Sequence, residues 1–169
     1  MAMASAQLAK DIAVFMDRLV DPKLSGLPPF LVKHPGVNNG YMIVQYVTTG
    51  LNADIAYLSN PISSVTTTVS AGQEAPNMRG DMAARKLVKI AEKLENIINL
   101  TILTALQAVD FVEGKMSPMN KELYDEIRRT VSFMENDDRI YERIEEMHRI
   151  LKSGKLLEIC ENHAGPFPI

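Results

Sequence analysis

The sequence predicts an all-α protein, and three observations support that prediction. Apolar side chains recur at spacings of three and four along most of the 169 residues, which is the period of one helix face. Only residues 62–70 are rich in β-branched and hydroxyl side chains, and no second stretch offers them a strand partner. Ten methionines and no tryptophan suit a helical core, because flexible thioethers fill irregular gaps. We expect a single helical domain over residues 1–169, with an extended segment at 62–70.

The first helices are bounded by proline and asparagine signals. Residues 2–20 have a helical apolar period, which Asp21-Pro22 ends. Residues 24–39 hold three prolines and two glycines among apolar side chains, so we expect an ordered loop there. Residues 40–58 then keep a helical period up to Asn60-Pro61, which predicts the second helix.

The strongest helical signal lies in residues 81–112, which contain neither proline nor glycine. A helix of about 30 residues would be roughly 45 Å long, beyond the usual length in globular proteins. Residues 96–109 are apolar on most faces, which predicts burial against several neighbouring helices. One short chain has few helices to offer, so this pattern favours an oligomer or a complex.

Three further helical pieces are expected after the long helix. Ser117-Pro118 has the form of an N-cap followed by the first helical position, and the apolar period runs to about Met134. Residues 139–151 form the next helix, which Ser153-Gly154 ends. A short helical piece at 156–160 precedes the tail.

Composition and charge exclude several classes of function. A formal net charge of −3, with no cluster of Lys and Arg in the sequence, argues against a nucleic-acid binder. Cys160 is the single cysteine, which excludes an internal disulfide and a cysteine-rich zinc site, and we expect it to be a buried structural thiol. His34, His148 and His163 lack the spacing of metal ligands, so we expect no metal site.

The sequence also argues against a membrane protein. Charged residues interrupt the first twenty positions, so no signal peptide is expected. The most apolar stretch, residues 97–109, is too short to span a bilayer and includes polar side chains. We therefore expect a soluble, cytoplasmic protein that binds neither membrane nor nucleic acid.

Residues 70–78 are the best candidate for a binding site. They place Gln73, Glu74 and Asn77 in a loop with glycine and proline, directly before the long helix. Gln73 and Asn77 can orient a polar ligand, and Glu74 can accept a hydrogen bond or a proton. The alternative is that these residues form only a turn and a cap for the following helix.

Several ordered stretches resemble the histidine and aromatic amino acid ammonia-lyase family. Residues 24–32 (LSGLPPFLV) are similar to a stretch of that family, and residues 37–43 (VNNGYMI) resemble its Leu-Asn-Ser-Gly-Phe-Met-Ile pattern. Asn60-Pro61, residues 70–74 (SAGQE) and residues 82–85 (MAAR) continue the resemblance in the same order. The resemblance covers most of this chain but only the later, carboxy-terminal part of the longer enzymes.

The resemblance implies a fold, a site and an assembly. It implies a long-helix bundle of the aromatic amino acid lyase type, which assembles as a tetramer with active sites lined by several subunits. Gln73 and Glu74 match the family's Gln-Glu beside the substrate side chain, with Glu74 as the catalytic residue. A glutamate there favours histidine as substrate, because a carboxylate can accept a hydrogen bond from an imidazole N–H. Tyrosine enzymes and aminomutases also carry this pair.

The family's electrophile is a methylidene-imidazolone ring formed from Ala-Ser-Gly, and this sequence has no Ala-Ser-Gly. The start at Met1, inside a predicted helix, together with this lack, suggests a split enzyme. In that hypothesis an upstream chain carries Ala-Ser-Gly and the ring, and this chain supplies a helical scaffold and a loop for the amino acid substrate. A truncated product, an aminomutase subunit and a non-catalytic helical or regulatory module remain alternatives. The loop after Glu74 is one residue shorter than the family's, which favours the last of these.

Overall fold

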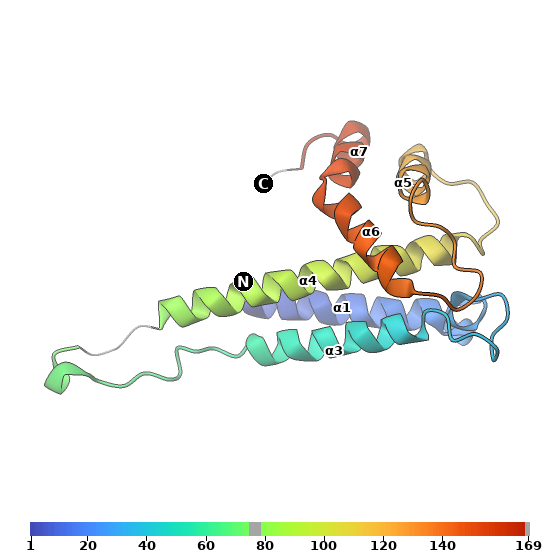
Figure 1. Cartoon of the computed structure of the whole chain (residues 1–169). Coiled ribbons are helices and arrows are strands. Elements are labelled where there is room, and N and C mark those ends of the chain that lie inside the picture. The colour runs from blue at the N-terminus through green and yellow to red at the C-terminus, as the bar shows by residue number, and fades with distance from the viewer. Residues whose placement is uncertain (75–78, 168–169) are drawn as a thin grey trace.

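A computed structural model describes residues 1–74 and 79–167, and this part of the chain is helical (Figure 1). It contains no named strand within those residues, only two isolated β-bridges. The helices are α1 (Ala2–Val20), α2 (Pro22–Ser25), α3 (Met42–Leu58), α4 (Gly80–Val109), α5 (Pro118–Arg128), α6 (Ile140–Lys152) and α7 (Lys155–Ala164), with 3₁₀ turns η1 (Pro29–Leu31) and η2 (Ser70–Gly72). The all-α prediction is confirmed.

The three long helices α1, α3 and α4 pack side by side and form the body of the molecule (Figure 1). Each helix expected from the sequence begins within two residues of the position where the structure begins it. The apolar half of α4 is buried as predicted, with Ile97, Leu100 and Leu103 at most 3% exposed. Helices α1, α3 and α6 of the same chain contact α4, so this burial does not by itself require an assembly.

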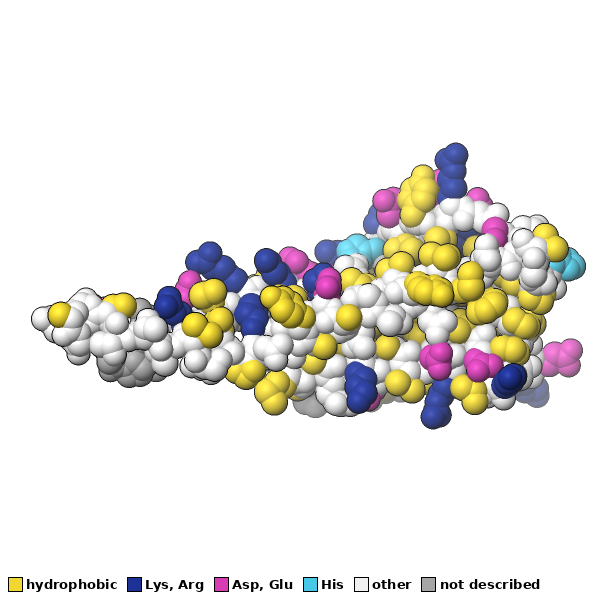
Figure 2. All heavy atoms as spheres, turned by 90° about the horizontal axis from the view of Figure 1, so that it is seen from below, with side chains coloured by type: hydrophobic (Ala, Val, Ile, Leu, Met, Phe, Trp, Pro, Cys, Tyr) yellow, Lys and Arg dark blue, Asp and Glu magenta, His cyan; other side chains and the backbone are white. Residues whose placement is uncertain are grey.

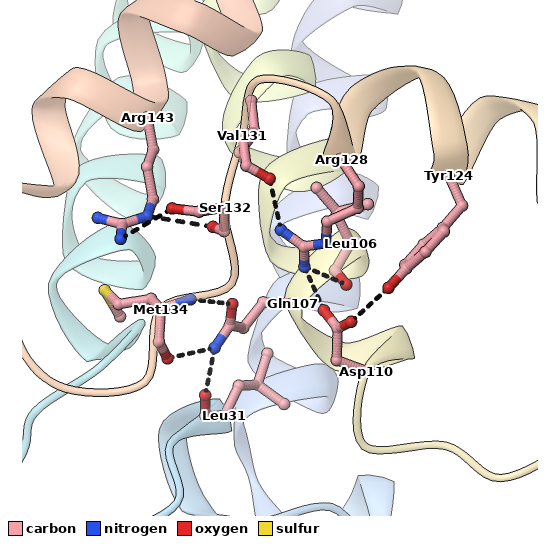
Figure 3. Close-up of polar contacts among 10 residues, drawn as sticks. All are labelled: Leu31, Leu106, Gln107, Asp110, Tyr124, Arg128, Val131, Ser132, Met134 and Arg143. Carbon is pink, nitrogen blue, oxygen red and sulfur yellow. Dashed lines mark hydrogen bonds and ion pairs between the residues drawn. The ribbon is translucent and has the colours of Figure 1, made fainter.

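A buried glutamine joins the carboxy-terminal segment to this body (Figure 3). The Nε2 of Gln107, on α4, donates to the carbonyl oxygens of Leu31 at 3.1 Å and Met134 at 2.8 Å. Its Oε1 accepts from the Met134 main-chain N–H at 3.1 Å. One side chain therefore ties together three segments that are distant in the sequence.

A second junction holds the loop before α3. The Asp137 carboxylate accepts from the main-chain N–H groups of Asn39 and Gly40, both at 2.8 Å, and Asn38 Oδ1 accepts from the Asp137 N–H at 2.9 Å. Gly40 has a φ of 55°, and a Cβ there would lie 2.2 Å from Cγ1 of Val32. The predicted loop is therefore ordered, and only glycine fits this position without strain.

Helices α5, α6 and α7 form a separate layer over the carboxy-terminal half of α4 (Figure 1). The helix predicted to run to Met134 ends at Arg128, because the chain turns back onto α4 and buries Val131 and Met134. Helix α7 is longer than the short piece predicted. Gly154 ends α6 in a left-handed conformation, as predicted. No helix in the described part of the chain is long and apolar enough to cross a membrane.

Candidate functional site

The segment between α3 and α4 extends away from the helices as an arm (Figure 1). Residues 65–69 are extended and pair with no strand in the described part of the chain, so the expected extended segment is shorter than 62–70: it has a turn at its start, and Ser70 already belongs to η2. Among residues 61–74, all except Ile62 and Val69 are exposed. The arm (residues 61–74) therefore has almost no covering from the helices of its own chain.

The end of the arm is a tight closed turn. The main chains of Val69 and Glu74 exchange hydrogen bonds of 3.1 and 3.3 Å, and the Gln73 N–H donates to the Ser70 carbonyl at 3.1 Å. Ser70 and Ala71 have φ values of 54° and 51°, a left-handed backbone that side chains other than glycine rarely adopt. Strained residues of this kind cluster at functional sites and persist where surrounding structure holds them.

Gln73 and Glu74 lie next to one another on this turn, and both are exposed. Within the described residues their side chains form no hydrogen bond or ion pair, so both are available to a ligand or a partner. The third predicted residue, Asn77, lies outside the described residues. The structure therefore brings two of the three predicted residues together and does not address the third.

The residues of this chain do not fit the family's ring. The nearest tripeptide, Ser70-Ala71-Gly72, has the serine first, where ring formation from Ala-Ser-Gly needs it in the middle. In the structure these three residues form the 3₁₀ turn η2 at the exposed end of the arm.

Two of the three histidines pair with carboxylates. The Nε2 of His163 lies 2.9 Å from Glu122, and the Nε2 of His148 lies 3.5 Å from Glu95. No group of three potential metal ligands occurs within residues 1–74 and 79–167. Cys160 is half-buried rather than fully buried.

A polar network around Asp110 is structural in character (Figure 3). Arg128 pairs with Asp110 and donates to the carbonyl oxygens of Leu106 and Val131 at 3.1 and 2.9 Å. Tyr124 donates to Asp110 at 2.6 Å, and this hydrogen bond raises the pKa of the tyrosine. The network fixes the end of α5 against the end of α4.

The loop before α3 has a backbone conformation that the sequence did not indicate. Phe30 and Leu31 have φ values of 53° and 57°, so two adjacent residues have left-handed backbone. Beside them lies a pocket of about 340 Å³ lined by Phe30, Met42, Gln45, Tyr46 and Thr49. Pro28-Pro29 was the only local signal, and it indicates a turn without indicating this conformation.

Comparisons with known proteins identify the family. The model of the aromatic amino acid lyase family matches residues 1–129. Histidine ammonia-lyase 1 of Fusobacterium nucleatum is 33% identical over 168 residues, which are 98% of this chain and 33% of that protein. Histidine ammonia-lyase of Alkaliphilus oremlandii is 35% identical over 162 residues, which are 95% of this chain and 32% of that protein.

Solved structures agree with this assignment. Histidine ammonia-lyase from Trypanosoma cruzi superposes with a TM-score of 0.90 at 28% identity, covering 95% of this chain and 32% of that one. Tyrosine aminomutase from Streptomyces globisporus gives 0.88 at 26% identity, covering 98% and 32%. This chain spans about a third of the length of these relatives. The chain belongs to the aromatic amino acid lyase family.

Proposed function

We propose that this chain is the carboxy-terminal component of a histidine ammonia-lyase whose methylidene-imidazolone ring is carried by another chain. The family match and the histidine ammonia-lyases among its relatives support the reaction class. The lack of Ala-Ser-Gly supports a ring on a separate polypeptide. In this proposal the chain is one helical domain, works in the cytoplasm and joins a tetramer-like core.

The observation that carries the proposal is the exposure of the arm. Gln73 and Glu74 stand on a strained turn that the helices of this chain leave uncovered. A binding residue needs a concave, partly dry surrounding to be selective, and a fully exposed turn does not supply one. The remaining walls of the site therefore come from another subunit, with Gln73, Glu74 and Asn77 contributed by this chain.

Glu74 would act on the substrate side chain. A histidine imidazole can donate a hydrogen bond to the Glu74 carboxylate, whereas a phenyl ring would leave the carboxylate unpaired in an enclosed site. Leaving a buried polar group unpaired costs about 1–3 kcal/mol, and more if it is charged. This difference favours histidine over phenylalanine.

An aminomutase is the second candidate, and the tyrosine aminomutase structures favour it. Their fold matches this chain nearly as well as that of the histidine ammonia-lyase, with TM-scores of 0.88 and 0.90. An aminomutase would return an amino acid with the amino group on the neighbouring carbon, without net release of ammonia. The loop after Glu74, which is shorter than the family's, favours a third alternative, a non-catalytic module.

The experiment is to co-express this chain with an amino-terminal lyase chain containing Ala-Ser-Gly, from the same genome, and to measure ammonia released from histidine, tyrosine and phenylalanine. We expect activity only when both chains are present, with histidine the preferred substrate. Rearranged amino acid without ammonia would identify the aminomutase. A well-formed complex inactive on all three substrates would contradict both enzymatic proposals.

Glu74→Gln tests the assigned residue. We expect turnover of histidine to fall by about 100-fold, the size typical of a lost acid–base or charged contact, while assembly with the other chain is unchanged. Glu113→Gln, at another exposed loop glutamate, is the matched control and should leave turnover unaffected. Equal kinetics for the Glu74 variant and the wild type would remove Glu74 from the site.

A further inference from the structure

The first turns of α4 are exposed in the part of the chain that the structure describes. Residues 80–85 are all exposed, so every face of the helix is open there. Met82, in these turns, is 43% exposed, and Val88, in the following turn, is 59% exposed. Helical turns without tertiary packing are marginal in water, because most helix stability in proteins comes from burying an apolar face. These turns therefore need a covering surface.

A groove lies beside them, where α3 ends and α4 begins. Its volume is about 430 Å³, and its lining combines apolar Leu58 and Met82 with charged side chains. The charged lining residues are Asp81, Arg85, Lys86 and Lys89. A groove of this composition suits an occupant that has both apolar and acidic groups.

The start of α4 is strongly basic although the chain as a whole is acidic. Residues 79–93 carry five basic and two acidic side chains, whereas the net charge of the chain is −3. Figure 2 shows Lys and Arg side chains along the half of the molecule that leads to the arm. The partial positive charge of the helix start adds to this field.

Some of these basic side chains form no ion pair with the described part of the chain. Arg85 pairs with Asp81 at 3.2 Å and Lys93 with Asp54 at 2.6 Å, whereas Lys89 has no ion pair within the described residues. Two copies of the same surface would repel one another, which disfavours symmetric self-association through it. An acidic partner would instead be attracted.

We propose that the α4 basic face, formed by Leu58, Met82, Arg85, Val88 and Lys89, docks an acidic segment with apolar side chains. The segment belongs to the chain that supplies the rest of the lyase fold, so this inference rests on the proposed function. Because the face adjoins the base of the arm, docking there would also fix the direction in which Gln73 and Glu74 point (Figure 1).

Charge reversal tests the proposal. Arg85→Glu combined with Lys89→Glu should weaken binding of the amino-terminal lyase chain by about tenfold or more, measured by titration calorimetry. The matched control reverses Lys23 and Lys115, two exposed lysines without ion pairs in the described part of the chain, and should change affinity by less than about twofold. Binding of the wild-type chain should weaken as salt increases, because salt screens exposed charges.

Other outcomes overturn the proposal. Circular dichroism of each variant alone first establishes that its helix content equals that of the wild type, and a variant that fails this check is replaced by Lys89→Glu alone. Equal affinity of the test and control variants, or an affinity that does not change with salt, contradicts docking on the α4 basic face. If the charge-reversed variant keeps its affinity but loses turnover, Arg85 and Lys89 bind an anionic small molecule instead of the other chain, which also overturns docking. If the wild-type chain binds no amino-terminal chain, the proposed function fails too; if binding and turnover survive charge reversal, only the docking surface fails.

Discussion

Two buried side-chain amides on α4, those of Gln107 and Asn99, differ in how completely they are hydrogen-bonded. Gln107 uses both its Nε2 and its Oε1, so both polar atoms of its side chain are paired. Asn99 donates from Nδ2 to the Ile144 carbonyl at 3.1 Å, but its Oδ1 is buried without a hydrogen-bond partner. A buried hydrogen bond adds little net stability, whereas an unpaired group costs the full loss of hydration. Similar chemistry therefore predicts opposite mutational effects.

Gln107→Leu should destabilise the chain by about 3 kcal/mol. The substitution keeps the volume roughly constant but leaves the Leu31 carbonyl and the Met134 main chain without their partner. Urea unfolding followed by circular dichroism measures the change. Gln73→Leu, on the exposed arm, is the control and should change the free energy of unfolding by less than about 0.5 kcal/mol.

Asn99→Leu should stabilise the chain by about 1 kcal/mol, because it removes the unpaired oxygen and adds apolar contact. The Ile144 carbonyl lies inside α6 and keeps the main-chain N–H of its own helix as a partner. The same unfolding experiment reports the result. A loss of stability would show that Asn99 Oδ1 has a partner in solution, such as an ordered water.

At the scale of elements, the sequence predicts where helices lie better than where they end. The proline and asparagine signals at Asp21-Pro22 and Asn60-Pro61 act locally, so the ends of α1 and α3 could be predicted. The end of α5 depends on contacts of Arg128 with Leu106 and Asp110 at the end of α4, and no local signal marks it. The left-handed pair Phe30 and Leu31 is likewise determined by packing.

The carboxy-terminal layer should loosen in acid before the three-helix body does. A hydrogen bond from Lys33 lowers the pKa of Glu135 from its usual 4.5, and the Arg139 N–H with Arg143 lowers that of Asp138 from 3.8. A carboxyl with a lowered pKa in the folded state stabilises above its unfolded value, and this contribution disappears as the pH falls through the folded value. The loss therefore begins below about pH 4.5 and grows towards lower pH.

Hydrogen exchange at pH 3 and pH 6, corrected for intrinsic rates, measures this effect. Amides in residues 132–152 should lose protection at pH 3 relative to those in α1 and α3. The variant combining Glu135→Gln with Asp138→Asn should show a smaller pH effect. Uniform loss of protection across all helices would contradict a layer that detaches separately.

At the scale of the whole molecule, the sequence allows the fold and the location of the candidate site to be predicted, but not its surroundings. The arm residues Gln73 and Glu74 could be identified from the motif. Their exposure could not, because it depends on how far the arm extends from the helices (Figure 1). The basic excess of residues 79–93 can be read from the sequence, but its position in a groove with Leu58 and Met82 could not, because that groove forms only where α3 ends beside α4.

In the exposed arm, the residues proposed to contact substrate are separate from the residues that hold the fold together. Its residues take almost no part in the packing of the body, so they can change with little effect on folding. Under the proposed function, the arm would be the place where substrate preference can drift or be engineered: residues 61–74 could be exchanged between relatives as a cassette. The helices beneath would impose only the spacing between the end of α3 and the start of α4.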